Sequence, residues 1–215
     1  MKPIFSLLFT LLAGAGICSG QLVTKKDFDA AFALQAGMGS GTAFPNPRGG
    51  LKAEGRGGLK MTFPFTRVWF LGAEINYNRL RTENRLKTAE SGAPEAVFRY
   101  DVSSVQIPVY ARMMLRNNKT SLLFGGYYAR HFDGKIDRKY DDGFRREPYG
   151  PESGSAGVVA GVEQIIGRNL YVTFTVNGSL TNMAPKEQFG SRLHPVQASL
   201  TVSYDLLRIG DCGCY

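Results

Sequence analysis

Strict alternation between apolar and polar residues is the feature that most constrains how this chain can fold. From Leu71 to Asn78 the odd positions are apolar and the even positions are polar or glycine, and Val196 to Leu206 repeats the pattern. A period of two is that of a β-strand with two unlike faces. The sequence therefore predicts an all-β protein whose sheet is apolar on one side only.

Further runs of the same kind follow one another along the chain. The clearer ones are Val105 to Met113 and Leu170 to Leu180, and the less regular ones are Ala31 to Met38, Gly58 to Phe65, Ser121 to Phe132 and Ser155 to Ile165. Together with the first two they amount to about eight strands, several close to the roughly 9 to 11 residues that a tilted strand needs to cross a bilayer.

The connections between these runs alternate between short and long. Tight junctions are expected at Thr66 and Arg67, at 116–119 and at 167–169, whereas 39–55, 81–96, 135–154 and 181–194 are long and rich in Gly, Pro or charge. In an up-and-down barrel this places all long loops at one end, and the short turns with both chain ends at the other. Bacterial outer-membrane barrels have this asymmetry, and closure pairs every strand edge. We expect an eight-stranded antiparallel up-and-down transmembrane β-barrel.

In such a barrel the polar faces would enclose the lumen, which eight strands leave about full of side chains. The polar set is Gln35, Thr62, Glu74, Asn76, Gln106, Arg112, Glu163, Thr173, Asn177, Ser199 and Asp205. Because buried charges survive only when paired, we expect a structural cluster of Glu74, Asn76, Arg112, Glu163 and Asp205, with Lys60 as a further member. Periodicity alone does not orient the faces, so a solvated surface on a soluble sheet is the alternative.

The apolar faces would then point outward to lipid. Trp69, Leu71, Ala73 and Ile75 would form part of this wall, after a hairpin at Thr66. Aromatic residues near the run ends, such as Tyr77 and Tyr204, suit the membrane interface.

The two ends of the chain have their own signals. Lys2 followed by the apolar stretch Ile4 to Leu12 and then by small residues predicts a signal peptide over 1–20, with the barrel over 21–209 and a short periplasmic tail over 210–215. Cys212 and Cys214 in this tail are a possible disulfide, a thiol pair or an idle segment. A metal site there would lack the usual four ligands.

Charge and residue types exclude several functions. The formal net charge is +8, but the basic residues are mixed with acids, and no basic helix or stacking surface for nucleic acid is present. The two histidines are His131 and His194; pairing His131 with Ser121 or Ser153 as base and nucleophile has no support from spacing. We expect no catalysis, no cofactor and no metal.

The stretches "SSVQIPVYARMML" and "SLLFGGYYARHF" contain an Ile-Pro step at Ile107 and a Gly-aromatic step at Gly126. With the Gly-rich "SGSAGVVAGVEQ" and the final alternating strand, the chain from Lys26 to Ile209 resembles the Bacteroidetes outer-membrane β-barrel family often called PorT-like. The resemblance implies a barrel of the size of OmpA or OmpX, located in the outer membrane and without an assigned activity. PorT itself is linked to protein secretion, but no group of residues in this chain indicates that role. The ending "IGDCGCY" differs from the usual final strand with a terminal aromatic residue.

These observations predict an integral outer membrane protein, cleaved close to Gly20, that acts as a structural or interaction scaffold through long surface loops. Its partners would be outer membrane lipid and an unknown protein or glycan at the loops, and we expect a monomer. The alternatives are a soluble exported barrel that carries an apolar ligand, as lipocalins do, or a narrow pore.

Overall fold

The structure is a computed structural model that describes residues 30–44, 53–66, 68–86, 96–115, 119–140, 143–148, 154–167, 169–182 and 194–209. The predicted signal peptide, residues 21–29 and the tail with Cys212 and Cys214 lie outside these ranges. Within them, no helix has the length and apolar character that crossing a membrane would require.

The described residues form nine β-strands. They are β1 (Ala30–Phe44), β2 (Glu54–Pro64), β3 (Trp69–Leu86), β4 (Ala96–Met114), β5 (Thr120–Tyr140), β6 (Gly143–Pro148), β7 (Gly154–Ile165), β8 (Leu170–Ser179) and β9 (His194–Ile209).

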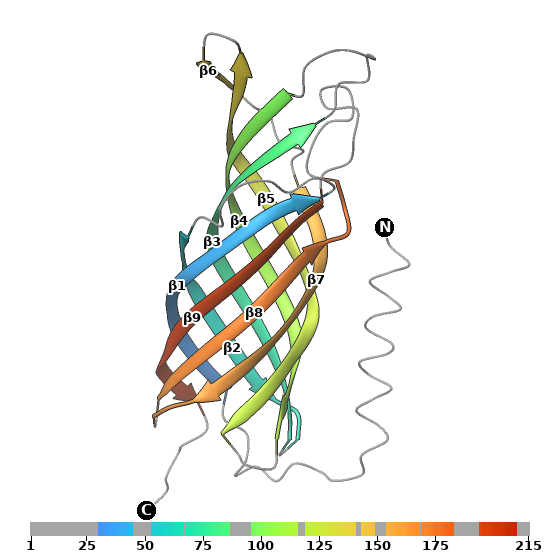
Figure 1. Cartoon of the computed structure of the whole chain (residues 1–215). Coiled ribbons are helices and arrows are strands. Elements are labelled where there is room, and N and C mark those ends of the chain that lie inside the picture. Colours follow the sequence, from blue (N-terminus) through green and yellow to red (C-terminus); the bar gives the residue numbers. More distant parts are fainter. Residues whose placement is uncertain are drawn as a thin grey trace, which may run out of the picture.

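Eight of these strands close into a barrel. Each strand pairs antiparallel with the next, β5 pairs with β7, and β9 returns to β1 over the register from Ala30↔Ile209 to Phe44↔His194. The short β6 pairs only with the far end of β5 and projects beyond the barrel (Figure 1). The predicted all-β, eight-stranded antiparallel up-and-down barrel is confirmed, with β6 as an addition.

Three tight hairpins lie at one end of the barrel, together with the first and last described residues. In the β2–β3 turn the Phe65 amide donates to the Trp69 carbonyl at 2.9 Å, and the Thr66 hydroxyl accepts from the Trp69 amide at 3.0 Å. The β4–β5 and β7–β8 turns are closed in the same way, by Leu115 N to Thr120 O at 2.8 Å and Ile166 N to Leu170 O at 3.0 Å. The three predicted short junctions are therefore confirmed, and the strand ends joined by the longer connections lie at the opposite end.

Three of the predicted long loops are partly strand, which corrects the sequence-based boundaries. β1 stays paired with β9 as far as Phe44↔His194, inside the expected loop 39–55. β3 and β4 stay paired as far as Leu86↔Ala96, inside the expected loop 81–96. β5 continues to Tyr140 and folds back through β6, inside the expected loop 135–154. Backbone pairing continues there although the apolar alternation has ended. The alternation ends because a strand beyond the apolar surface gains nothing from an apolar face.

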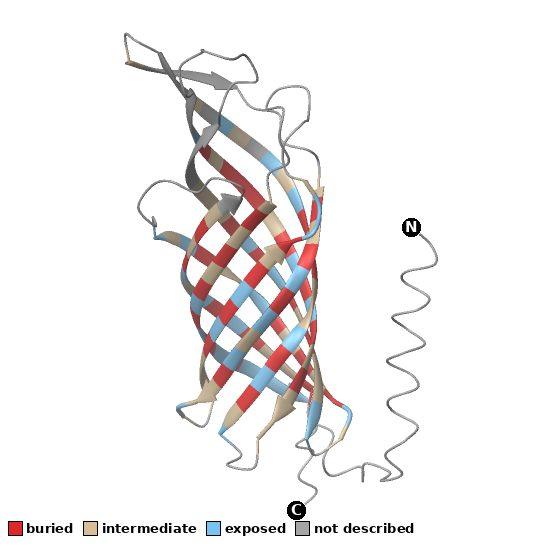
Figure 2. Cartoon of the chain, turned by 45° about the vertical axis from the view of Figure 1, so that its right-hand side comes forward, coloured by how far each residue is buried: buried red, intermediate tan, exposed pale blue. Residues whose placement is uncertain are grey.

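Along each strand buried and exposed residues alternate, and Figure 2 shows this as red and pale blue bands that wind round the barrel. The exposed outward residues are mostly large and apolar, and we call them the outer apolar belt: Leu34, Met38, Leu59, Ile75, Ile107, Val109, Phe124, Val158, Val162, Phe174, Val176, Leu200 and Val202. Trp69 is likewise exposed, and Leu71 and Ala73 are half-buried on the same outward face. The predicted outward wall is confirmed.

All eleven side chains of the predicted polar face are buried inside the barrel. A carrier of an apolar ligand needs an apolar interior and a polar surface, which is the reverse of these faces. The soluble-carrier alternative is therefore not compatible with the structure.

Candidate functional site: the polar network of the barrel lumen

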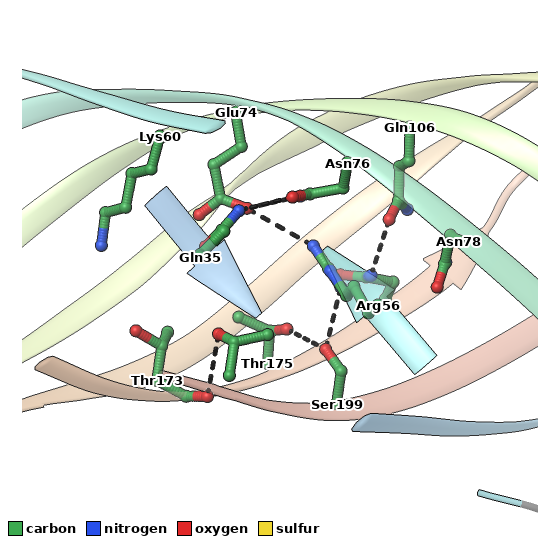
Figure 3. A network of polar contacts seen from close by, with 12 residues as sticks. Gln35, Arg56, Lys60, Glu74, Asn76, Asn78, Gln106, Thr173, Thr175 and Ser199 are labelled. Atoms are coloured by element: carbon green, nitrogen blue, oxygen red, sulfur yellow. Dashed lines mark hydrogen bonds and ion pairs between the residues drawn. The ribbon is translucent and has the colours of Figure 1, made fainter. Parts of the chain in front are cut away.

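The carboxylate of Glu74, on β3, is the centre of a hydrogen-bond network in the lumen (Figure 3). Its Oε2 accepts from Gln35 Nε2 at 2.9 Å and from Asn76 Nδ2 at 2.7 Å, and its Oε1 accepts from the Tyr110 hydroxyl at 2.7 Å. Arg56 adds an ion pair, with Nη2 3.4 Å from Oε2. Three hydrogen-bond donors and one cation thus surround this buried carboxylate, as burial of a polar group requires.

Arg56 extends the network to the other side of the lumen. Its Nη1 donates to the Ser199 hydroxyl of β9 at 2.9 Å, and Ser199 in turn lies 2.7 Å from the Thr175 hydroxyl of β8. Strands β2, β3, β8 and β9 are thereby joined through side chains as well as through the sheet.

Glu163, on β7, forms a second centre and is completely buried. It is paired with Lys60 of β2, and its Oε1 lies 3.0 Å from Arg112 Nε of β4. The Thr173 hydroxyl donates to its Oε2 at 3.0 Å. Since β2 and β7 are four steps apart in either direction round the barrel, the Lys60–Glu163 pair spans the full width of the lumen.

Aromatic and small residues complete the packing around these charges. The Arg112 guanidinium lies over the Phe70 ring at 5.1 Å and the Tyr171 ring at 5.7 Å. The Tyr110 ring occupies the space beside Gly72, where an added Cβ would stand 2.1 Å from the ring. Glycine at position 72 is thus required by close approach and lets the Tyr110 hydroxyl reach Glu74.

Cavities lie on either side of this packed middle section. The one near the short turns has a volume of about 530 Å³ and is lined by residues that include Phe70, Arg112, Tyr171, Asp205 and Arg208. The one toward the opposite end holds about 30 Å³, the scale of a single water molecule, and is lined in part by Asn78, Gln106, His131 and Gln197. Asn78 and Gln197 bond to each other across this upper part of the lumen.

The structure brings together most, but not all, of the predicted cluster. Arg112, Glu163 and Lys60 form one group, and Glu74 and Asn76 form another. Asp205 stands apart from both, near the short turns: it accepts from the Tyr171 hydroxyl at 2.8 Å and from Arg208 Nη2 at 3.0 Å. The expectation of a single cluster that includes Asp205 is corrected, because Asp205 lies too near the barrel mouth to reach the central cations.

Two members of the network were missed at the sequence level. Arg56 directly follows the expected loop 39–55, although it shares the parity of Lys60, which was the available signal. Tyr110 lies on the polar face of its strand, but its aromatic ring gave no reason to assign it to a charge cluster.

His131 does not form the serine–histidine pairs that were considered. Its Nε2 lies 3.1 Å from Ser155 Oγ, while Ser121 accepts from Arg112 Nε at 3.1 Å and Ser153 lies outside the described residues. His131 Nδ1 is buried without a hydrogen-bond partner in the described part of the chain, so no acid orients the ring as a catalytic triad requires. Nor do the described residues contain a group of three or more His, Cys, Asp or Glu side chains able to hold a metal ion.

A closed antiparallel barrel with an apolar exterior and a polar, ion-paired interior has the architecture of transmembrane β-barrels. No protein-family model matches the chain, and no curated protein matches its sequence.

Several solved bacterial structures are similar in fold. Ail of Yersinia pestis has 12% identity and a TM-score of 0.42, covering 83% of this chain and 99% of its own. The outer membrane protein OprG of Pseudomonas aeruginosa has 11% identity and a TM-score of 0.45, covering 83% and 96%. Neisserial surface protein A has 10% identity and a TM-score of 0.40, covering 82% and 99%. Ail has also been solved with the heparin analogue sucrose octasulfate. At such low identity the resemblance concerns the course of the chain and not its activity.

Proposed function

We propose that this protein is an integral outer membrane barrel that serves as a scaffold: it anchors the strands and loops of its outer end at the cell surface, without catalysis and without conducting ions. The observation that carries the proposal is the outer apolar belt around a lumen crossed by the Lys60–Glu163 ion pair. The belt makes lipid the fitting surroundings, and the ion pair makes the interior a support and not a channel.

Side-chain bonds at several levels of the lumen argue against the narrow-pore alternative. A permeating ion would have to break the Asn78–Gln197 pair, then the contacts of Arg56 with Glu74, and then the Lys60–Glu163 pair. Each separation leaves buried charged or polar groups without partners, which is costly. These bonds favour a sealed barrel.

The outer end supports display. β3, β4 and β5 extend past the neighbouring β2, whose first residue is Glu54, and β6 adds a further hairpin above them (Figure 1). Backbone pairing holds this extension in a defined shape, as a binding surface for a protein or glycan requires. The proposed protein is a monomer whose outer end binds a protein or glycan.

Three measurements, one on cell fractions and two on the purified protein, test the proposal. The folded barrel should migrate faster on a gel without boiling than after boiling, should stay with envelope membranes after alkaline carbonate washing, and should give no discrete channels in a planar bilayer. Recovery in the soluble periplasmic fraction without a heat-dependent shift would refute membrane insertion. Regular single-channel steps from the wild-type protein would refute the sealed lumen and favour the pore.

A variant that combines Lys60→Ala and Glu163→Ala with Arg56→Ala and Asn78→Ala provides the positive control for conductance, because it interrupts the bonds at all three levels of the lumen. It should admit water and small ions where the wild type does not. Leu200→Ala is the matched control: it changes the volume of an outward side chain without altering the lumen, and it should give no channels in the planar bilayer.

A further inference from the structure

On the outward face of β3, β4 and β5, apolar residues give way to cations at one level of the barrel. Tyr77, Val105 and Arg130 are direct neighbours in register across the three strands. Two residues further along β3 stands Arg79, and two beyond it Arg81, both outward and partly exposed. A strand advances about 3.4 Å per residue, so Arg79 stands roughly 7 Å beyond Tyr77 along the strand.

The cations are held in place by a shared carboxylate. Arg79 donates to Asp101 through Nε and Nη2, both at 2.6 Å, and Arg81 Nε donates to Asp101 Oδ2 at 3.0 Å. Lys135 stands beside Asp101 in register on β5. Arg81 Nη1 also lies 3.4 Å from Glu54 Oε1, so Asp101 and Glu54 together hold the two guanidinium groups in place.

The region as a whole keeps a positive excess. Among its described side chains five are cationic and three are acidic: Arg79, Arg81, Arg99, Arg130 and Lys135 against Glu54, Asp101 and Asp137. We call these five residues the cationic border. The outward described residues of β1, β7, β8 and β9 in the same half of the barrel include no Lys, Arg, Asp or Glu. Among the described residues of this half, the charge is thus confined to one side of the barrel.

An aromatic surface adjoins the cationic border. The rings of Tyr77 and Phe132 lie 6.1 Å apart and are 48% and 58% exposed. Rings at this position suit the membrane interface. Arg130 stands level with Tyr77 in register, and Arg79 and Arg81 follow Tyr77 along β3, where guanidinium groups can reach lipid phosphates. Arginine is the side chain that binds phosphate oxygens in a bidentate way.

We infer that the cationic border binds a phosphorylated glycolipid of the outer leaflet, with its phosphates on Arg79, Arg81 and Arg130 and its apolar part against Tyr77 and Phe132. This inference rests on the proposed function, because it requires this end of the barrel to face the outer leaflet. A lipid already present in the bilayer is the occupant that the position favours, since the border begins where the apolar belt ends.

The test uses the full, refolded protein in dodecylmaltoside micelles, with lipid A that keeps its phosphates and the same lipid A after removal of its phosphates. Bound lipid is counted by native mass spectrometry over a range of lipid concentrations. The main variant combines Arg79→Gln, Arg81→Gln and Arg130→Gln. Arg130→Gln and Lys119→Gln form a matched pair, because each removes one exposed cation, Arg130 in the middle of β5 and Lys119 directly before β5 at the end with the short turns.

The wild type should bind phosphorylated lipid A more tightly than the dephosphorylated form. One exposed cation near a lipid surface contributes about fivefold in affinity, so Arg130→Gln should weaken binding about fivefold and the triple variant by at least about tenfold. Lys119→Gln should bind as the wild type does. Equal binding of the two lipids, or equal binding by Arg130→Gln and Lys119→Gln, would overturn the inference, as would displacement of lipid A by inorganic phosphate at matching concentration.

Heat-dependent gel migration, recorded for each sample beforehand, separates this result from the proposed function. A wild type without the shift would refute the barrel in the membrane itself. If only the triple variant lost the shift, Arg130→Gln and Lys119→Gln would decide the question, because single exposed cations are not part of the barrel's packing.

Discussion

Lys60→Met should destabilise the barrel by about 2 to 3 kcal/mol, because Lys60 is one of the partners of a completely buried carboxylate. Removal of one partner from a buried ion pair costs about 3 to 5 kcal/mol when the other charge is left alone. Glu163 is not left alone, since Arg112 Nε at 3.0 Å and the Thr173 hydroxyl at 3.0 Å remain. The loss should therefore fall below the full range.

Glu163→Gln should cost more, about 4 to 5 kcal/mol, because two buried cations, Lys60 and Arg112, would then face a neutral amide. When the two substitutions are combined, Lys60→Met removes one of these cations. The double variant should be more stable than the sum of the two single effects implies, by about 1 kcal/mol or more.

Trp69 is the sole tryptophan and reports on unfolding directly. It is exposed on the outward face, with its ring 5.8 Å from that of Phe124. Its fluorescence should shift to longer wavelength as urea unfolds the barrel from phospholipid vesicles, and the midpoint and slope give the free energy. Thr201→Val, a buried and uncharged lumen position, is the control and should cost about 1 kcal/mol. If Lys60→Met unfolded at the wild-type midpoint with the wild-type slope, the lumen would have to be hydrated at this level and the reasoning would fail.

Three further predictions concern the exterior, the packing and the outer end. Leu200→Arg, in the middle of the outer apolar belt, should destabilise the inserted barrel by about 2 to 4 kcal/mol, whereas Leu207→Arg near the short turns should cost about 0 to 1 kcal/mol; equal urea midpoints would contradict the lipid-facing assignment. Gly72→Ala should cost about 1 to 3 kcal/mol, because the added methyl group meets the buried Tyr110 ring, and an unchanged midpoint would show that the ring can move aside. Although partial burial opposes it, hydrogen bonds from the two flanking arginines lower the pKa of Asp101 below its ordinary 3.8. Its stabilising contribution should thus be complete above pH 3.8 and be lost only as pH falls through the lower folded value, and an NMR titration of the carboxyl carbon with a midpoint at or above 3.8 would contradict this.

The architecture could be predicted from the sequence because two different environments meet each strand. Lipid on one side and a filled lumen on the other impose the period of two, which is visible in runs such as Val196 to Leu206. Short junctions such as that at Thr66 then distinguish the end of the barrel with short turns from the end with long connections. β6 lies beyond the apolar surface of the barrel, so neither of its faces requires apolar residues. Its sequence therefore lacks the period of two, and the strand could not be predicted.

Partner choice inside the lumen could not be predicted. Lys60 is the direct register neighbour of Glu74, and a reading of adjacent strands would pair them. In the structure Lys60 instead reaches Glu163 on the opposite wall, and Glu74 takes Arg56. The carboxylate that a lysine reaches across a barrel depends on the diameter of the barrel and on the stagger of its strands. Neither quantity can be predicted from the local sequence.

The ion pair that spans the lumen has a consequence for biogenesis. Lys60 and Glu163 are far apart in sequence and lie on opposite walls, so they meet only when the sheet has curled. A flat, open sheet entering lipid would carry these charges uncovered into hydrocarbon, which costs several kcal/mol for each. The chain is therefore expected to curl before or while it enters the bilayer.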